Sequence, residues 1–190
     1  EYVLKYSNNQ SVYREIKGRR KKKSLEDIFV GTLREIMIER LEDQRTGIIW
    51  SEKMILLKIK MNLKLEIGTK ALSKIENTDS KFFAELILSA KKQLDSLWNT
   101  NIFRRITNSK IKRWTCMDRK KSLPLGHIDL FCSPDLIFQI QNKWHLLRLD
   151  FLGERTNSFQ DLEALAMVNW SIKNRNLPNL AKKFVVDVLK

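Results

Sequence analysis

Apolar residues recur at helical spacing through the first half of the chain. After Ser24 they form one stripe that comprises Leu25, Phe29, Leu33, Ile36, Met37 and Leu41. Because an α-helix turns once every 3.6 residues, this spacing predicts a helix with one buried face. Ser24 can cap its start, and Asp27 stands three residues later, where a capping box has its acidic partner. The pattern therefore predicts a helix that begins at Ser24.

Further helices are predicted on both sides of a group of strands. Residues 51–68 repeat the apolar spacing, with a serine that can cap the start and a glycine that can stop the end. Residues 80–98 predict a third helix and residues 102–106 a shorter one. The helical spacing returns in residues 158–176, just before Pro178.

The period changes to alternation after residue 109. We expect strands at residues 110–118, 126–131, 135–141, 144–152 and 182–189. The pair Asn142-Lys143 suits a tight hairpin turn between the third and fourth of these. This order predicts a mixed α/β domain over residues 24–190, with a central mixed sheet that has an antiparallel hairpin core and flanking helices. Residues 1–23 would form a basic N-terminal segment.

The composition describes a folded domain without a membrane span. The chain has 190 residues, of which 43% are hydrophobic and 31% are charged. No apolar run reaches the roughly 18 residues of a span, and the first residues show no signal-peptide pattern. We expect an intracellular protein, either cytoplasmic or nucleoid-associated, or nuclear or organellar in a eukaryote. Cys116 and Cys132 lack zinc-site spacing and are expected to be reduced core residues. Because the sequence begins at Glu1 rather than at methionine, we expect a piece of a longer chain.

The net charge of the chain suggests a class of partner. Lys and Arg number 36 against 22 Asp and Glu, which gives a formal charge of +14. Such an excess favours a polyanion, most simply nucleic acid, although composition drift in an AT-rich genome would give the same excess. The densest basic run is either a solvated loop or a phosphate-binding patch. Its candidate DNA contacts are Arg19, Arg20, Lys21, Lys22 and Lys23.

Two aspartates each close a short apolar run of the expected strands. Because side chains alternate between faces, His127 shares a face with Asp129, and Arg148 and Leu152 share a face with Asp150. If the two strands pair, both carboxylates point to one place, and a proton or a divalent cation must lie between them. Carboxylate oxygens suit Mg²⁺ or Mn²⁺, which could activate water against a phosphodiester. The alternative is that both aspartates only start turns or lie at a solvated edge.

The same residues resemble a nuclease family. "GHIDLF" (residues 126–131), a hairpin and "LRLDFLGE" (residues 147–154) resemble the core of the PD-(D/E)xK superfamily, and most closely the RecB/AddA-type nuclease domains of helicase–nucleases. In that family a G-x-I-D strand supplies a metal-binding aspartate, which matches Asp129. A D-Y-K-like triplet then aligns with Asp150 and its two successors. The resemblance covers residues 24–190 and implies a restriction-endonuclease-like fold.

The chain departs from this family where its chemistry is concentrated. Leu152 stands at the catalytic lysine, and an aliphatic side chain cannot stabilise developing negative charge. Arg34 stands near the metal-binding histidine, and a guanidinium has no lone pair for a metal. Gln160 matches a Q-x-x-x-Y motif whose tyrosine is replaced by Ala164. The resemblance thus implies a nuclease fold that has lost catalysis, in which the carboxylates and Gln160 are vestigial and no cofactor is needed.

Two residues could restore the missing chemistry. Arg148 could stabilise phosphate charge, although it cannot act as a base, and a simple ion pair with Asp150 is the preferred interpretation. His127 could replace the lost metal ligand, although a half-exposed strand residue is preferred. An active exonuclease or endonuclease that uses Mg²⁺ or Mn²⁺ is therefore one alternative function. An architectural domain that binds only protein is another.

The resulting expectation is a domain that binds or guides DNA, as a single strand or a duplex end, without cutting it. It would belong to a helicase–nuclease system of repair or recombination and would contact other domains or subunits of that assembly. Arg34 and Arg148 join the basic run as candidate DNA contacts, because phosphate contacts need no active site.

Overall fold

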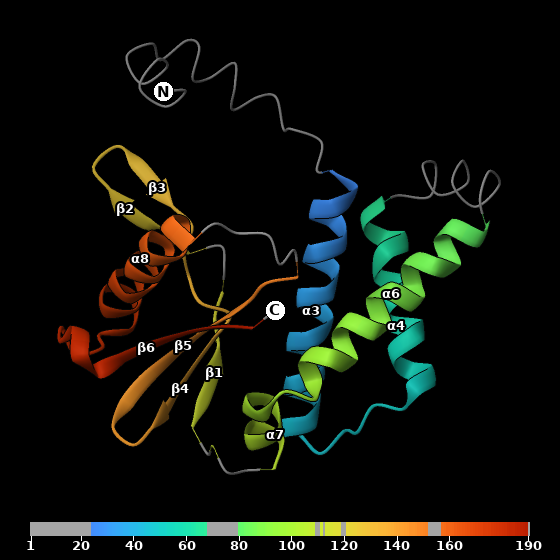
Figure 1. The fold of residues 1–190 in the computed structure, drawn as a ribbon, viewed down its shortest axis with the longest axis horizontal. Helices are drawn as coiled ribbons and strands as arrows, with labels where there is room; N and C mark the ends of the chain where they lie inside the picture. Colours follow the sequence, from blue (N-terminus) through green and yellow to red (C-terminus); the bar gives the residue numbers. More distant parts are fainter. Residues whose placement is uncertain are drawn as a thin grey trace, which may run out of the picture.

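The computed structural model describes residues 24–67, 80–108, 111, 113–118, 121–151 and 157–189. A mixed sheet lies between a group of helices on one face and α8 on the other (Figure 1). The described helices are α3 (Leu25–Arg45), α4 (Glu52–Ile67), α6 (Ser80–Trp98), α7 (Asn101–Thr107) and α8 (Asn157–Arg175). The strands are β1 (Trp114–Cys116), β2 (Leu123–Leu125), β3 (Ile128–Leu130), β4 (Leu136–Ile140), β5 (Lys143–Leu149) and β6 (Phe184–Leu189). The predicted mixed α/β class is therefore confirmed.

The start of α3 follows the sequence prediction closely. The Asp27 amide donates to Ser24 Oγ at 3.0 Å, and the Ser24 amide donates to Asp27 Oδ2 at 3.1 Å, which completes the capping box. Most of the predicted stripe is buried, whereas Leu25 is 52% exposed because it lies in the first turn. In α4 the Met54 amide donates to Ser51 Oγ at 3.3 Å, as expected for a capping serine.

The strands form two separate sheets rather than one. The order in the larger sheet is β1-β4-β5-β6, in which β1, β4 and β5 are antiparallel and β6 is parallel to β5. The crossover from β5 to β6 runs through α8, as a parallel connection requires. The β4–β5 turn places Gln141 and Asn142 at φ of 48° and 61°, so the turn lies one residue earlier than predicted. Strands β2 and β3 pair only with each other among the described strands.

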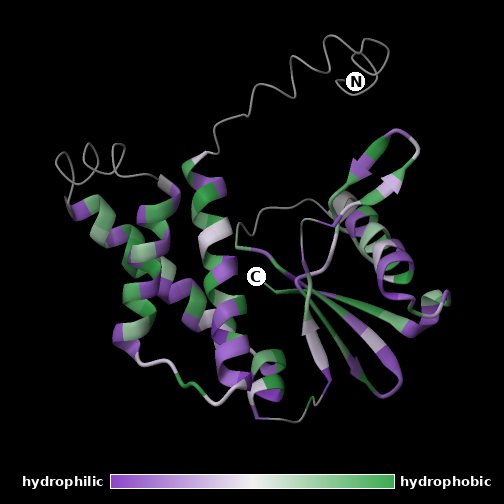
Figure 2. Ribbon diagram, turned by 180° about the vertical axis from the view of Figure 1, so that it is seen from behind, coloured by the Kyte–Doolittle hydropathy of each residue, from purple (hydrophilic) through white to green (hydrophobic). Residues whose placement is uncertain are grey.

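The larger sheet separates two hydrophobic cores. Leu147 and Leu149 of β5 pack with α3, α4, α6 and α7, while Leu146 faces the opposite way and packs with α8. This alternation is the period-two pattern of a strand that is covered on both faces. In Figure 2 the central strands are largely hydrophobic and the turns at their ends are hydrophilic. Packing on both faces of the sheet therefore holds α3 and α8 in place relative to the ends of the strands.

Both cysteines behave as structural residues. Cys116 is partly buried in β1, and Cys132 is buried just after β3 rather than within a strand. Neither forms a disulfide, and burial raises the pKa of both thiols, which keeps them protonated at neutral pH. Within the described segments, no helix combines the length and apolar character needed to cross a membrane.

Candidate functional site

Asp129 does not lie beside Asp150 on an adjacent strand. It belongs to β3, where it is paired with Pro124 of β2, and it is exposed. Its Oδ1 accepts a hydrogen bond from Ser122 Oγ at 3.0 Å. The neighbours of β5 are β4 and β6. The predicted pairing of these two strands is therefore wrong, because Gly126, at φ of 60°, turns the chain back into a hairpin instead of extending the larger sheet.

His127 shares this location and does not rebuild a metal site. It lies in the turn between β2 and β3 and is exposed. Across the residues that the structure describes, no three His, Cys, Asp or Glu side chains are grouped to hold a metal ion. The preferred interpretation of His127 as an exposed residue agrees with its position, although it lies in the turn and not in the strand.

A different aspartate lies at the same end of the larger sheet as Asp150. Asp135 immediately precedes β4, and Asp150 immediately follows β5, so antiparallel pairing brings both to the same end of the larger sheet. The Asp135 amide donates to Leu147 O at 2.7 Å, and the Asp150 amide donates to Leu189 O at 2.8 Å. Both residues are buried. The candidate site therefore consists of Asp135 and Asp150, whose backbones meet at this end of the sheet.

Arg34 brings a positive charge to this pair from α3. Its Nε lies 3.3 Å from Asp135 Oδ1, and its Nη2 donates to Leu149 O at 2.9 Å. The other carboxylate oxygen of Asp135 accepts from the Leu149 amide at 2.7 Å. The side chain of Asp135 is 1% exposed and that of Arg34 is 15% exposed. A buried carboxylate of this kind requires a compensating charge, and Arg34 supplies it.

Arg148 points toward α8 instead of pairing with Asp150. Its Nη2 lies 2.7 Å from Glu163 Oε1, and its Nη1 donates to Ser133 O at 2.9 Å. The preferred ion pair with Asp150 is thus replaced by one that holds α8 against the sheet. Because Arg34 and Arg148 are both largely buried in such pairs, neither offers an open contact for DNA phosphates.

Several predicted positions lie outside the described residues. These are Leu152 and the basic run Arg19, Arg20, Lys21, Lys22 and Lys23. The backbone of Gln160 belongs to α8, as predicted, but its side chain is also outside the description. Ala164 lies in the same helix and is partly buried. The helical position of the Q-x-x-x-A segment is therefore confirmed, while the role of Gln160 stays a prediction.

Sequence reasoning missed Asp135 and Glu163, although a signal for Asp135 was present. The turn at Gln141 joins β4 directly to β5, so the aspartates closest to the two far ends of that hairpin are Asp135 and Asp150. No comparable local signal marks Glu163, because its partner Arg148 is distant in the sequence and meets it only after α8 packs on the sheet.

Comparison of the chain with protein-family models, with curated proteins and with solved structures finds no match. The interpretation of the site therefore depends on its own geometry.

The corrected site predicts that Asp129 tolerates replacement. Asp129→Ala removes an exposed side chain with one exposed hydrogen bond, and we expect the free energy of unfolding to fall by less than about 0.5 kcal/mol. Urea denaturation of the variant and the wild type measures this difference. A loss above about 2 kcal/mol would mean that Asp129 belongs to a buried network and that the corrected assignment is wrong.

Proposed function

We propose that this chain is a degenerate nuclease-like domain of the PD-(D/E)xK kind, which holds or guides a DNA strand without cutting it. The observation that carries the proposal is the ion pair between Arg34 and Asp135 at the common end of β4 and β5. A permanent cation there takes the position in which a pair of carboxylates would otherwise face a divalent ion. The domain would serve a helicase–nuclease assembly of repair or recombination.

The strand order supports a restriction-endonuclease-like fold. Three successive strands of the larger sheet, β1, β4 and β5, are antiparallel, and α8 then leads to the parallel strand β6. The sequence predicted this helix–strand order, and the resemblance implies a mixed sheet with an antiparallel hairpin core. The additional β2–β3 hairpin lies between β1 and β4 in the sequence and packs beside α8 through Leu123 (Figure 1).

We propose that Asp135 replaces Asp129 in the alignment with the superfamily, which leaves the G-x-I-D segment outside the site. Pro134-Asp135 precedes β4, and Asp150-Phe151-Leu152 follows β5. The sequence thus contains P-D and then D-x-L, in which only the lysine is replaced. Both aspartates of this pattern are buried at one end of the sheet, whereas Asp129 is exposed in the β2–β3 hairpin. This difference in burial supports the proposal.

The residues present do not fit a metal-dependent reaction. The guanidinium of Arg34 has no lone pair for a cation and adds positive charge beside Asp135. Leu152 cannot stabilise negative charge on a phosphodiester. Arg148, which could have supplied a cation, is held by Glu163. We therefore propose a domain without a metal cofactor, whose remaining function is strand binding, supported by the formal charge of +14.

The proposed loss of a metal site can be tested by restoring the histidine at position 34 and the lysine at position 152. We expect Arg34→His/Leu152→Lys to bind Mn²⁺, because an imidazole ligand replaces the guanidinium beside the Asp135 carboxylate. At about a hundredfold excess over Kd, binding adds about 2.7 kcal/mol, or roughly 5–10 °C of Tm for a chain of this size. Differential scanning fluorimetry with and without Mn²⁺ measures the shift.

The matched control adds Asp135→Asn to the double variant and should abolish the shift, while wild-type Tm should not respond to Mn²⁺. Plasmid digestion and fluorescence anisotropy with single-stranded DNA are measured on the same samples. Mn²⁺-dependent cutting by the wild type would replace our proposal with an active nuclease. Absence of DNA binding at low salt would favour the protein-binding architectural domain.

A further inference from the structure

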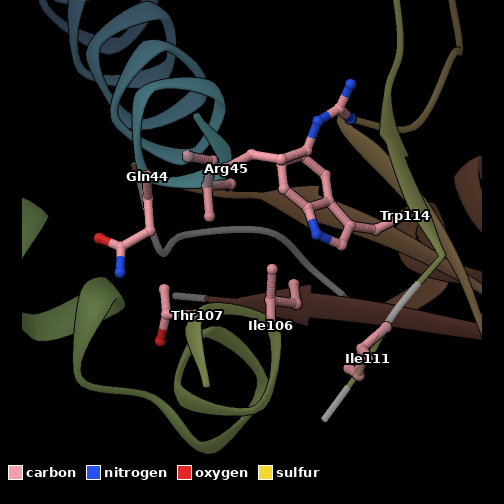
Figure 3. A pocket seen from close by; sticks show the side chains of 7 residues that line it. Gln44, Arg45, Ile106, Thr107, Ile111 and Trp114 are labelled. Atoms are coloured by element: carbon pink, nitrogen blue, oxygen red, sulfur yellow. The ribbon is translucent and has the colours of Figure 1, made fainter. Parts of the chain in front are cut away.

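A pocket of about 400 Å³ opens where the end of α3 meets α7 and β1 (Figure 3). Leu41, Ile106 and Ile111 give it an apolar part, and all three are buried. Its volume lies within the range of about 300–1,000 Å³ that small-ligand pockets occupy. The pocket is separate from the carboxylate pair, because it lies at Trp114 at the start of β1 rather than beside the start of β4.

The opposite part of the pocket combines an aromatic ring with polar side chains. The indole of Trp114 is partly buried, and the guanidinium carbon of Arg45 lies 5.1 Å from its ring centroid. Gln44 and Thr107 also line the pocket, and Figure 3 shows them on the far side from Trp114. The guanidinium covers one face of the indole, so the Trp114–Arg45 pair together offers a stacking surface to a flat ring, while an amide and a hydroxyl offer hydrogen bonds to its edge.

Three further arginines are close in sequence to residues that line this pocket. Arg104 and Arg105 lie in α7 next to Ile106, and Arg113 immediately precedes Trp114. Arg104 and Arg113 are exposed, Arg105 is partly exposed, and none of the three takes part in an ion pair that the structure describes. A flat-ring pocket beside uncompensated arginines suits a ligand that carries both aromatic rings and phosphates.

We propose that this pocket accepts a base of single-stranded DNA. In this proposal the base stacks against the Trp114–Arg45 pair. The side chains of Gln44 and Thr107 face the edge of the base, and the neighbouring phosphates contact Arg104, Arg105 and Arg113. This inference rests on the proposed function, because the ligand is the DNA strand that the domain is proposed to hold. The Met117 amide donates to Asp135 O, and Trp114 lies three residues earlier, or roughly 10 Å along the strand. Strand β1 thus separates the pocket from the carboxylate end of the sheet by a length that a few nucleotides can span.

The test compares two oligonucleotides of equal charge by fluorescence anisotropy. One is an oligothymidine dodecamer, and the other is an abasic dodecamer with the same number of phosphates. We expect the wild type to bind the thymidine strand about 5- to 150-fold more tightly, because one stacked base contributes about 1–3 kcal/mol. Trp114→Leu should reduce thymidine binding to the abasic level and leave abasic binding unchanged. Trp114→Phe should keep most of the preference, because a phenyl ring still stacks.

Trp144→Leu provides the matched control, since Trp144 is a partly buried tryptophan of β5 that does not line the pocket. It should keep the full preference for bases. Equal binding of the two strands by the wild type, or a preference that survives Trp114→Leu, would overturn the base pocket and leave strand binding intact. If the wild type binds neither oligonucleotide, both the base pocket and the proposed strand-binding function are overturned. If Trp114→Leu does not fold by circular dichroism, Gln44→Ala takes its place with the same expected direction.

Discussion

Replacing Arg34 with methionine is expected to lower the free energy of unfolding by about 3–5 kcal/mol. The substitution leaves the Asp135 carboxylate, which is 1% exposed, without the guanidinium that lies 3.3 Å away. It also removes the hydrogen bond to Leu149 O. Because domains of this size are stable by about 5–15 kcal/mol, such a loss would be visible in any unfolding experiment. Urea denaturation followed by circular dichroism measures it.

The same substitution at Arg45 gives the matched control. Arg45 lies in the same helix and is 55% exposed, with an ion pair to Glu42 at 3.7 Å and a cation–π contact with Trp114, so Arg45→Met should cost less than about 2 kcal/mol. Adding Asp135→Asn to Arg34→Met should recover more than half of the loss, because the amide oxygen can still accept from the Leu149 amide while the buried charge is gone. A loss below about 1 kcal/mol for Arg34→Met, or no recovery in the double variant, would show that the pair does not stabilise the strand ends.

The helices and the order of the sheet could be predicted because their signals are local. The Ser24 capping box and the apolar stripe of α3 involve residues three or four apart, so tertiary contacts reinforce a preference that the sequence already contains. The predicted strands at residues 135–141 and 182–189 contain β4 and β6. Their observed bounds are shorter, since a strand ends where its partner ends and the partner is not a local property.

The error at Asp129 has a structural cause. Alternation of apolar and polar residues cannot say which partner a strand will take, and residues 126–131 satisfy the same pattern as residues 135–141. The missing information was β2, a short strand that contains Pro124 and that therefore lacks a clear strand signal. Pairing with β2 uses β3 in a separate hairpin, so Asp135 rather than Asp129 reaches the end of β5.

The position of Arg34 was predicted better than that of its partner. The resemblance placed Arg34 near the family's metal-binding histidine, and in the structure its long side chain reaches the carboxylate of Asp135. The ion pair predicted between Arg148 and Asp150 was wrong, because Arg148 pairs with Glu163 of α8 instead. Ion-pair partners across a fold depend on how helices dock, which a strand pattern does not contain.

The largest effect expected on DNA binding comes from the basic run outside the described residues. Simultaneous replacement by glutamine should make the binding of single-stranded DNA much less dependent on salt. The four replaced residues are Arg20, Lys21, Lys22 and Lys23. Each phosphate contact contributes about −0.7 to the slope of log K against log salt concentration, so four contacts contribute about −2.8. Between about 50 and 200 mM salt the wild type should then lose about fiftyfold more affinity than the variant.

Fluorescence anisotropy across a salt series measures both slopes, and the affinity should fall alike for every DNA sequence, because phosphates carry no base information. The matched control replaces Lys53, Lys60, Lys81 and Lys92, four exposed lysines of α4 and α6, with glutamine and so removes the same charge. It should keep most of the wild-type slope. If both variants flatten the slope equally, the attraction is a property of the whole charge of +14, and the basic run is not a specific contact surface.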